Sequence, residues 1–146
     1  MKFNKIICGV DFSQPSVLAF DAAVEIARLF KAQLHVMHVI EAYPVVAEWL
    51  PTGRLDELAT SLEDKATSAM EALIATAKKA VNGTSITTEI ARGRAYVEIL
   101  HKAHEWQADL IILGAKGLTL PEDAFSGSTA ERVMKEAKCS VLIVRG

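Results

Sequence analysis

Apolar residues in this chain follow two kinds of pattern: short continuous runs, and longer stretches with helical spacing. The short runs predict strands at Lys5–Val10, Gln33–Ile40, Ser85–Ala91, Asp109–Gly114 and Ser140–Val144. Longer stretches, in which apolar residues recur every three or four positions, separate these strands. Strands that alternate with helices are typical of a parallel sheet with helical crossovers, so we expect an α/β fold.

Four helices are predicted from the longer stretches. The first begins after Ser13, a capping residue, with Pro15 in its first turn. Its predicted apolar face comprises Val17, Ala19, Ala22, Ala23, Ile26, Ala27 and Phe30. The remaining helices are predicted from about Leu55 to Val81, from Ala95 to Trp106, and from about Ser128 to Ala137.

The order of the strands in the sheet follows from their patterns. The third strand alternates apolar residues with Thr87 and Glu89, which favours an edge position, whereas the first, fourth and fifth are apolar throughout. With right-handed crossovers, this predicts one doubly wound, five-stranded parallel sheet of order 3-2-1-4-5, with helices on both faces. The winding reverses between strands one and four. A ligand is therefore expected at the loops after Val10 and Leu113.

Composition indicates one domain, residues 1–146, since 146 residues with 51% hydrophobic content suffice for one core. A net charge of −2 does not suggest a nucleic-acid or anionic-membrane partner. Cys8 and Cys139 lie in or beside apolar runs, and we interpret them as reduced, buried thiols. Neither a signal peptide nor an apolar run of ~20 residues is present, which predicts a soluble, cytoplasmic protein.

The most informative motif follows the fourth strand. Gly114, Ala115, Lys116 and Gly117 are followed by nine residues and then by Gly127, Ser128 and Thr129, where a helix opens. Phosphate oxygens need close approach to backbone N–H groups, which a Cβ atom obstructs, and a helix N-terminus supplies such groups with partial positive charge. The spacing therefore predicts a phosphate-binding loop.

Side chains in the same motif add donors. Ser128 and Thr129 supply hydroxyl groups, and Lys116 supplies a mobile cation. The alternative is that Gly114 and Gly117 only turn the chain and that a hydroxyl only caps the helix. The combination at the reversal of the sheet favours phosphate binding. The spacing is neither a Walker A motif nor a dinucleotide fingerprint.

On these residues the chain resembles the universal stress proteins of the nucleotide-binding subgroup, whose pattern is Gly, two residues, Gly, nine residues, Gly, then Ser or Thr. Gly114, Gly117, Gly127 and Ser128 match it. The resemblance also covers Val10–Ser13, His38–Ile40, Gly93, Cys139 and Val141–Val144. The departures are Arg94 and Ser140, where many relatives have proline, and Thr129, where many have valine; Arg94 leaves open how the Gly93 loop approaches the ligand.

The resemblance implies that ATP or another adenine nucleotide binds, with Mg²⁺. It implies that Val10 and Val39 lie against the adenine, that Asp11 hydrogen-bonds the adenosine part, and that the glycine loop with Ser128 and Thr129 holds the phosphates. Asp11 also suits ribose hydroxyls or a nucleotide-bound Mg²⁺, because it follows a presumed central strand. The alternative for Asp11 is a charge and cap for the first helix.

No catalytic or metal-ligating set is predicted. His35 and His38 are three apart on a strand and point to opposite faces, while His101 and His104 share a helix face without a further ligand nearby. Ser126 and Ser128 lack a histidine and an acid in any recognisable nucleophile arrangement. A phospho-acceptor receiver domain would need an aspartate at the end of the third strand, where residues 91–93 have none.

Two functional classes remain. The first is a stress-response module that senses an adenine nucleotide as a homodimer formed through the strand Ser140–Val144, whose uncharged edge invites pairing with a second copy. The alternative is a slow ATPase or self-phosphorylating enzyme that uses the same pocket. Neither a general base nor an arginine is positioned for phosphoryl transfer, which favours binding over catalysis.

Overall fold

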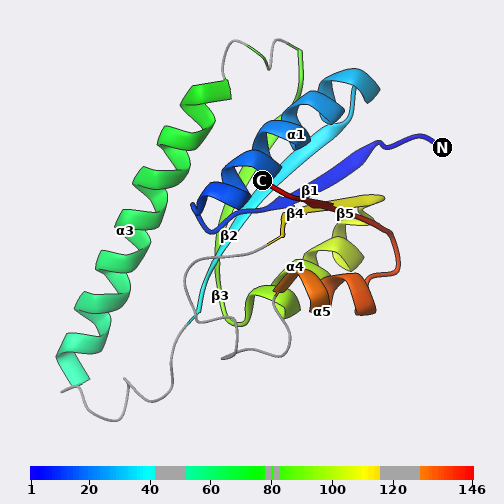
Figure 1. The fold of residues 1–146 in the computed structure, drawn as a ribbon. Coiled ribbons are helices and arrows are strands. Elements are labelled where there is room, and N and C mark those ends of the chain that lie inside the picture. The colour runs from blue at the N-terminus through cyan, green and yellow to red at the C-terminus, as the bar shows by residue number, and fades with distance from the viewer. Residues whose placement is uncertain (42–51, 78–79, 81–82, 116–128) are drawn as a thin grey trace.

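The computed structural model describes residues 1–41, 52–77, 80, 83–115 and 129–146. Strands and helices alternate along these residues (Figure 1). The elements are β1 (Lys5–Gly9), α1 (Gln14–Phe30), β2 (Gln33–Ile40), α3 (Thr52–Ala77), β3 (Ile86–Arg92), α4 (Ala95–Trp106), β4 (Leu110–Gly114), α5 (Thr129–Glu136) and β5 (Ser140–Val144).

The five strands form one parallel sheet of order β3-β2-β1-β4-β5. The predicted order is confirmed, with β3 and β5 at the edges. The winding reverses between β1 and β4, which pair in parallel with Cys8 opposite Ile112. The carboxyl ends of these two central strands therefore lie next to each other, which is where open α/β sheets bind ligands.

The predicted bounds of β2, α4 and β5 match the structure, and the other elements shift by a few residues. β1 ends at Gly9 rather than Val10, because the carbonyl of Val10 contacts a side chain instead of continuing the ladder. β4 begins one residue after Asp109, whose carboxylate accepts the backbone N–H groups of Asn4 and Lys5 at 3.0–3.2 Å. β3 lies one residue later than predicted. α5 is described from Thr129 and ends at Glu136, one residue before the predicted end, whereas Ser128 lies outside the described residues.

Helix α3 begins three residues before the predicted position and ends at Ala77. Its C-terminal half packs on the sheet through Ala66, Met70 and Leu73, which are buried. Its N-terminal half is largely exposed, including Leu58 at 41%. Among the described residues no helix is both long and apolar enough to span a bilayer.

Two hydrophobic cores lie on opposite faces of the sheet. Helices α1 and α3 cover one face, and α4 and α5 cover the other (Figure 1). The first core includes Ile6, Cys8, Phe20, Val36 and Ile112; the second includes Ile7, Met37, Ile99, Ile111 and Val133. Because both faces are covered, the central strands are apolar at nearly every position.

The start of α1 follows the prediction. Ser13 is the N-cap residue, and its Oγ accepts the Ser16 N–H at 3.5 Å. The buried face differs in part from the predicted one: Ala19, Ala23 and Ala27 are buried, but Phe20 and Val24 are buried with them, whereas the other predicted face residues are only partly buried. Since α1 is apolar around much of its circumference, only the packing decides which stripe faces the sheet.

Both cysteines are free, as expected. Cys8 is fully buried, and burial raises the pKa of its thiol to about 12. Cys139 is partly buried, and burial raises the pKa of its thiol as well. Both thiols are therefore protonated at neutral pH and are weak nucleophiles.

Candidate functional site

The candidate site lies where β1 and β4 end. Cys8 and Ile112 are register partners, so Val10 and Gly114, each two residues further along parallel strands, reach the same level. The loop Val10–Ser13 leads from β1 into α1 at this level. The structure thus brings together two of the predicted segments, the Val10–Asp11 segment and the first glycine of the motif.

Asp11 is fixed in a compact turn before α1. Its Oδ1 accepts the backbone N–H of Ser13 at 2.9 Å and also the Ser13 hydroxyl. Its own N–H donates to Ser16 Oγ at 3.2 Å. This is an Asx-type turn, in which a carboxylate two residues upstream binds a backbone N–H. Asp11 is therefore not the cap of α1; it orients Ser13, which is the cap.

Phe12, the next residue, has a backbone conformation that is unusual for its type. Its φ is +65°, in the left-handed region that a bulky residue rarely adopts. Its ring packs against the ring of His38, with centroids 4.6 Å apart. His38 Nδ1 lies 2.7 Å from the carbonyl oxygen of Val10. β2 therefore supports the loop after β1 through one side chain.

The two valines predicted to contact adenine belong to different faces of the sheet. Val10 is 5% exposed and is part of the core under α1 and α3. Val39 is partly buried and packs against the core under α4 and α5. Of the two, Val39 has the more accessible side chain.

Gly114 is needed by the protein itself. A Cβ atom at this position would lie 2.6 Å from the carbonyl carbon of Pro15 and 2.9 Å from the backbone nitrogen of Ser16. The end of β4 therefore touches the first turn of α1 backbone to backbone. Of the two interpretations of this glycine, close packing within the chain is the one that the contacts demonstrate.

The rest of the predicted motif is only partly described. Lys116, Gly117, Gly127 and Ser128 lie outside the described residues. Thr129 is the first residue of α5 and is partly buried. Helix α5 packs against α4 and β5, so its N-terminus is held by the part of the sheet that contains β4.

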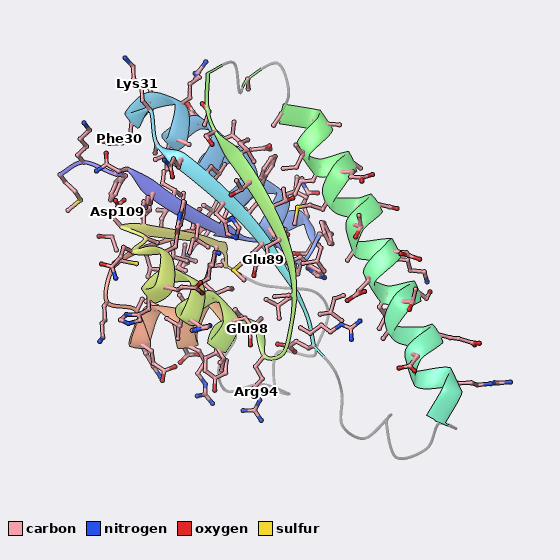
Figure 2. The ribbon with its side chains drawn as sticks, turned by 180° about the vertical axis from the view of Figure 1, so that it is seen from behind. Phe30, Lys31, Glu89, Arg94, Glu98 and Asp109 are labelled. Atoms are coloured by element: carbon pink, nitrogen blue, oxygen red, sulfur yellow. The ribbon has the colours of Figure 1, made fainter. Side chains whose placement is uncertain are left out.

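The turn from β3 into α4 borders the same edge of the sheet. Gly93 has a φ of +139°, and its N–H donates to the carbonyl of Ile40 at 3.1 Å. Glu41 Oε1 accepts the N–H of Ala95, the first residue of α4, at 3.0 Å. Arg94 occupies the N-cap position in an extended conformation and has no side-chain capping bond. Figure 2 shows Arg94 where this turn enters α4.

The predicted geometry of the histidines agrees with the structure. His38 contacts Phe12 on the face under α1, whereas His35 contacts Thr87 and Trp106 on the face under α4. His101 and His104 are exposed on α4. Within the described ranges no group of three His, Cys, Asp or Glu side chains is arranged to hold a metal ion.

Three residues of this site were not predicted to support it: Ser16, His38 and Glu41. Ser16 could have been found from the sequence, since a serine in the first turn of a helix often bonds the chain just before it. Glu41 acts across 54 positions and His38 across 28, so local patterns do not reveal their contacts.

The sequence matches a known protein family along nearly its whole length. The model of the universal stress protein family matches residues 2–145. The chain belongs to this family. A universal stress protein of Methanocaldococcus jannaschii is 36% identical over 144 residues, covering 98% of this chain and 82% of the relative. One of Bacillus subtilis is 31% identical over 149 residues, covering 98% and 99%.

Solved structures of the family share the fold. Universal stress protein UspA from Lactobacillus plantarum superposes with a TM-score of 0.82 at 28% identity and 99% coverage of both chains. A universal stress protein solved in complex with cAMP has a TM-score of 0.74 at 24% identity, covering 99% of this chain and 98% of the other. One from Archaeoglobus fulgidus in complex with dAMP has a TM-score of 0.65 at 20% identity, covering 99% of both.

Proposed function

We propose that this universal stress protein binds an adenine nucleotide at the carboxyl ends of β1, β2 and β4. The adenosine part contacts the Val10–Asp11 segment and Val39. The phosphates lie on Gly114, Lys116, Gly117, Gly127, Ser128 and Thr129. One observation carries the proposal: the ordered Asp11 turn and the first motif glycine stand at one level, where the winding of the sheet reverses.

The chemistry of the described residues suits a nucleoside. Asp11 brings a carboxylate to the rim, and ribose hydroxyls are donors that a carboxylate accepts. Its direction is set before any ligand arrives, since Ser13 donates to it twice. A preoriented acceptor loses little conformational entropy on binding.

The choice of adenine has separate support. The two family members described above with cAMP and dAMP are proteins of the same fold with adenine nucleotides bound. Mg²⁺ enters the proposal through the phosphates: a nucleotide-bound Mg²⁺ keeps several waters and needs only one or two carboxylates from the protein.

Isothermal titration calorimetry with AMP and with ATP plus Mg²⁺ tests the proposal. We expect saturable binding, tighter for ATP because the glycine loop adds phosphate contacts. Gly127→Val and Ser128→Ala should weaken ATP more than AMP. Ser68→Ala, an exposed serine on α3, is the control. Absence of heat and saturation with both nucleotides at millimolar concentration would refute the function.

We also propose that the protein acts in the cytoplasm as a ligand-sensing homodimer through β5. This strand is an edge, with β4 on one side only. Val141 and Ile143 pack on the protein's own core, but Leu142 stays 37% exposed. A second copy paired antiparallel across a two-fold axis would cover Leu142 and satisfy the edge N–H and C=O groups.

A further inference from the structure

We propose that His38 is a positioning residue for nucleotide binding: its Nδ1–H holds the carbonyl of Val10 and thereby sets the Asp11 turn. This inference rests on the proposed function for its ligand and on the contacts of the loop for its structural part. Neither part follows from the glycine motif.

The direction of the hydrogen bond is determined by chemistry. A backbone carbonyl can only accept, so the proton between Val10 and His38 is on Nδ1. A neutral His38 therefore has its unprotonated nitrogen at Nε2. The bond is 2.7 Å long and joins β2 to the first residue after β1. It replaces a ladder contact at the point where β1 ends.

The bond acts at the start of a conformationally costly loop. Val10 N–H donates to the carbonyl of Met37 at 2.9 Å, so both backbone groups of Val10 are held by consecutive residues of β2. Two residues later, Phe12 has its φ of +65°. A non-glycine residue keeps such a conformation only when its surroundings enforce it. His38 supplies one such constraint through its bond to Val10, and its ring also contacts Phe12.

The orientation of Asp11 depends on the bond between His38 and Val10. Asp11 lies between Val10 and Phe12, and its turn closes only if the backbone after Val10 leads toward Ser13 and Ser16. Releasing the carbonyl of Val10 would let Phe12 relax to negative φ and turn the Asp11 carboxylate away. His38 thus acts on the ligand through Asp11 and needs no ligand contact of its own.

Two substitutions separate the hydrogen bond from the ring. His38→Asn places an amide N–H where Nδ1–H stands and removes the ring. His38→Phe keeps a ring against Phe12 and removes the donor. His101→Asn and His101→Phe, at an exposed position on α4, are the matched controls. Calorimetry with AMP and with ATP plus Mg²⁺ is combined with hydrogen exchange of the Asp11 and Ser13 amides in the free proteins, and circular dichroism verifies folding.

We expect His38→Phe to weaken AMP and ATP by the same factor, about tenfold, because the loss concerns the adenosine side only. The exchange of the two amides should become about tenfold faster. His38→Asn should restore both values to within about twofold of the parent. Equal affinities for His38→Phe and parent, or an asparagine variant as weak as the phenylalanine variant, would overturn the inference.

The exchange measurement needs no nucleotide, and this separates the two proposals. If the parent binds neither nucleotide, the proposed function is wrong, and with it the ligand role of His38. Unchanged amide exchange in His38→Phe would show that His38 does not set the turn, whatever the nucleotide result. Unfolding of His38→Phe leaves the decision to His38→Asn, whose parent-like exchange and affinity the inference requires.

Discussion

A Cβ atom on Gly114 would lie 2.6 Å from the carbonyl carbon of Pro15, closer than real Cβ contacts allow. The neighbouring atoms belong to the backbone of the first turn of α1, which cannot rotate away as a side chain would. The first glycine of the motif is therefore required for α1 to dock on β4, with or without a ligand.

The first prediction follows from this contact. Gly114→Ala should lower the free energy of unfolding by roughly 1–3 kcal/mol, the usual cost of inserting a methyl group into a packed site. Urea unfolding of the ligand-free protein, followed by circular dichroism, measures it. Gly83→Ala is the control: among the described residues nothing lies within 4 Å of a Cβ atom at that position, so only its φ of +91° opposes the change. A Gly114→Ala protein as stable as the parent would contradict the packing argument.

A second prediction concerns the end of α1. Lys31, whose position Figure 2 shows, has a φ of +54°. Its backbone N–H donates to the carbonyls of Ala27 and Arg28 and so closes the helix. Glycine adopts this conformation without steric cost, so Lys31→Gly should stabilise the protein by roughly 0.5–1 kcal/mol. Lys31→Ala, which keeps the steric cost, should gain nothing. Thermal unfolding of the parent and the two variants shows whether each substitution raises or lowers the stability of the protein.

A third prediction concerns pH. His35 is buried, with its Nδ1 2.7 Å from Thr87 Oγ1 and its Nε2 3.4 Å from Glu89 Oε1, and Lys102 pairs with the same Glu89. Burial lowers the pKa of His35 below its ordinary 6.5, the charge of Lys102 lowers it further, and Glu89 opposes both. The folded protein thus resists a proton that the unfolded chain accepts.

Protonation of His35 should therefore lower the free energy of unfolding as the pH drops below 6.5, by at most about 1.4 kcal/mol per pH unit. Above pH 6.5 this residue should contribute no pH dependence. His35→Gln should flatten the dependence between pH 6.5 and 5. His104→Gln, an exposed histidine, should leave it unchanged. Urea unfolding at several pH values measures all three proteins, and identical slopes for parent and His35→Gln would disprove the assignment.

The proposed dimer gives a fourth prediction. Leu142→Lys changes a side chain that is already 37% exposed, so the fold should survive while the edge of β5 acquires a charge that opposes pairing. Light scattering should show a dimer for the parent and a monomer for the variant. Leu29→Lys, at a 70% exposed leucine on α1, serves as the control. A parent that stays monomeric at high micromolar concentration rules the dimer out.

The sequence by itself determined the class of fold, the strand order and the family. Alternating apolar runs and amphipathic stretches are local patterns, and the rules for crossovers convert them into a sheet order without further information. The alternation around Thr87 and Glu89 placed β3 at the edge, as found. Ser13 and Pro15 marked the start of α1 because capping depends only on neighbours in the chain.

Only the tertiary structure decided which atoms support the site. Three contacts join segments that are far apart in the sequence. Gly114 faces the backbone of Pro15, His38 bonds the carbonyl of Val10, and the carboxylate of Glu41 caps the start of α4. The left-handed φ of Phe12 could not be predicted either, because its residue type opposes it and only surrounding contacts impose it. Local patterns specify elements, whereas the mutual approach of elements selects the individual bonds.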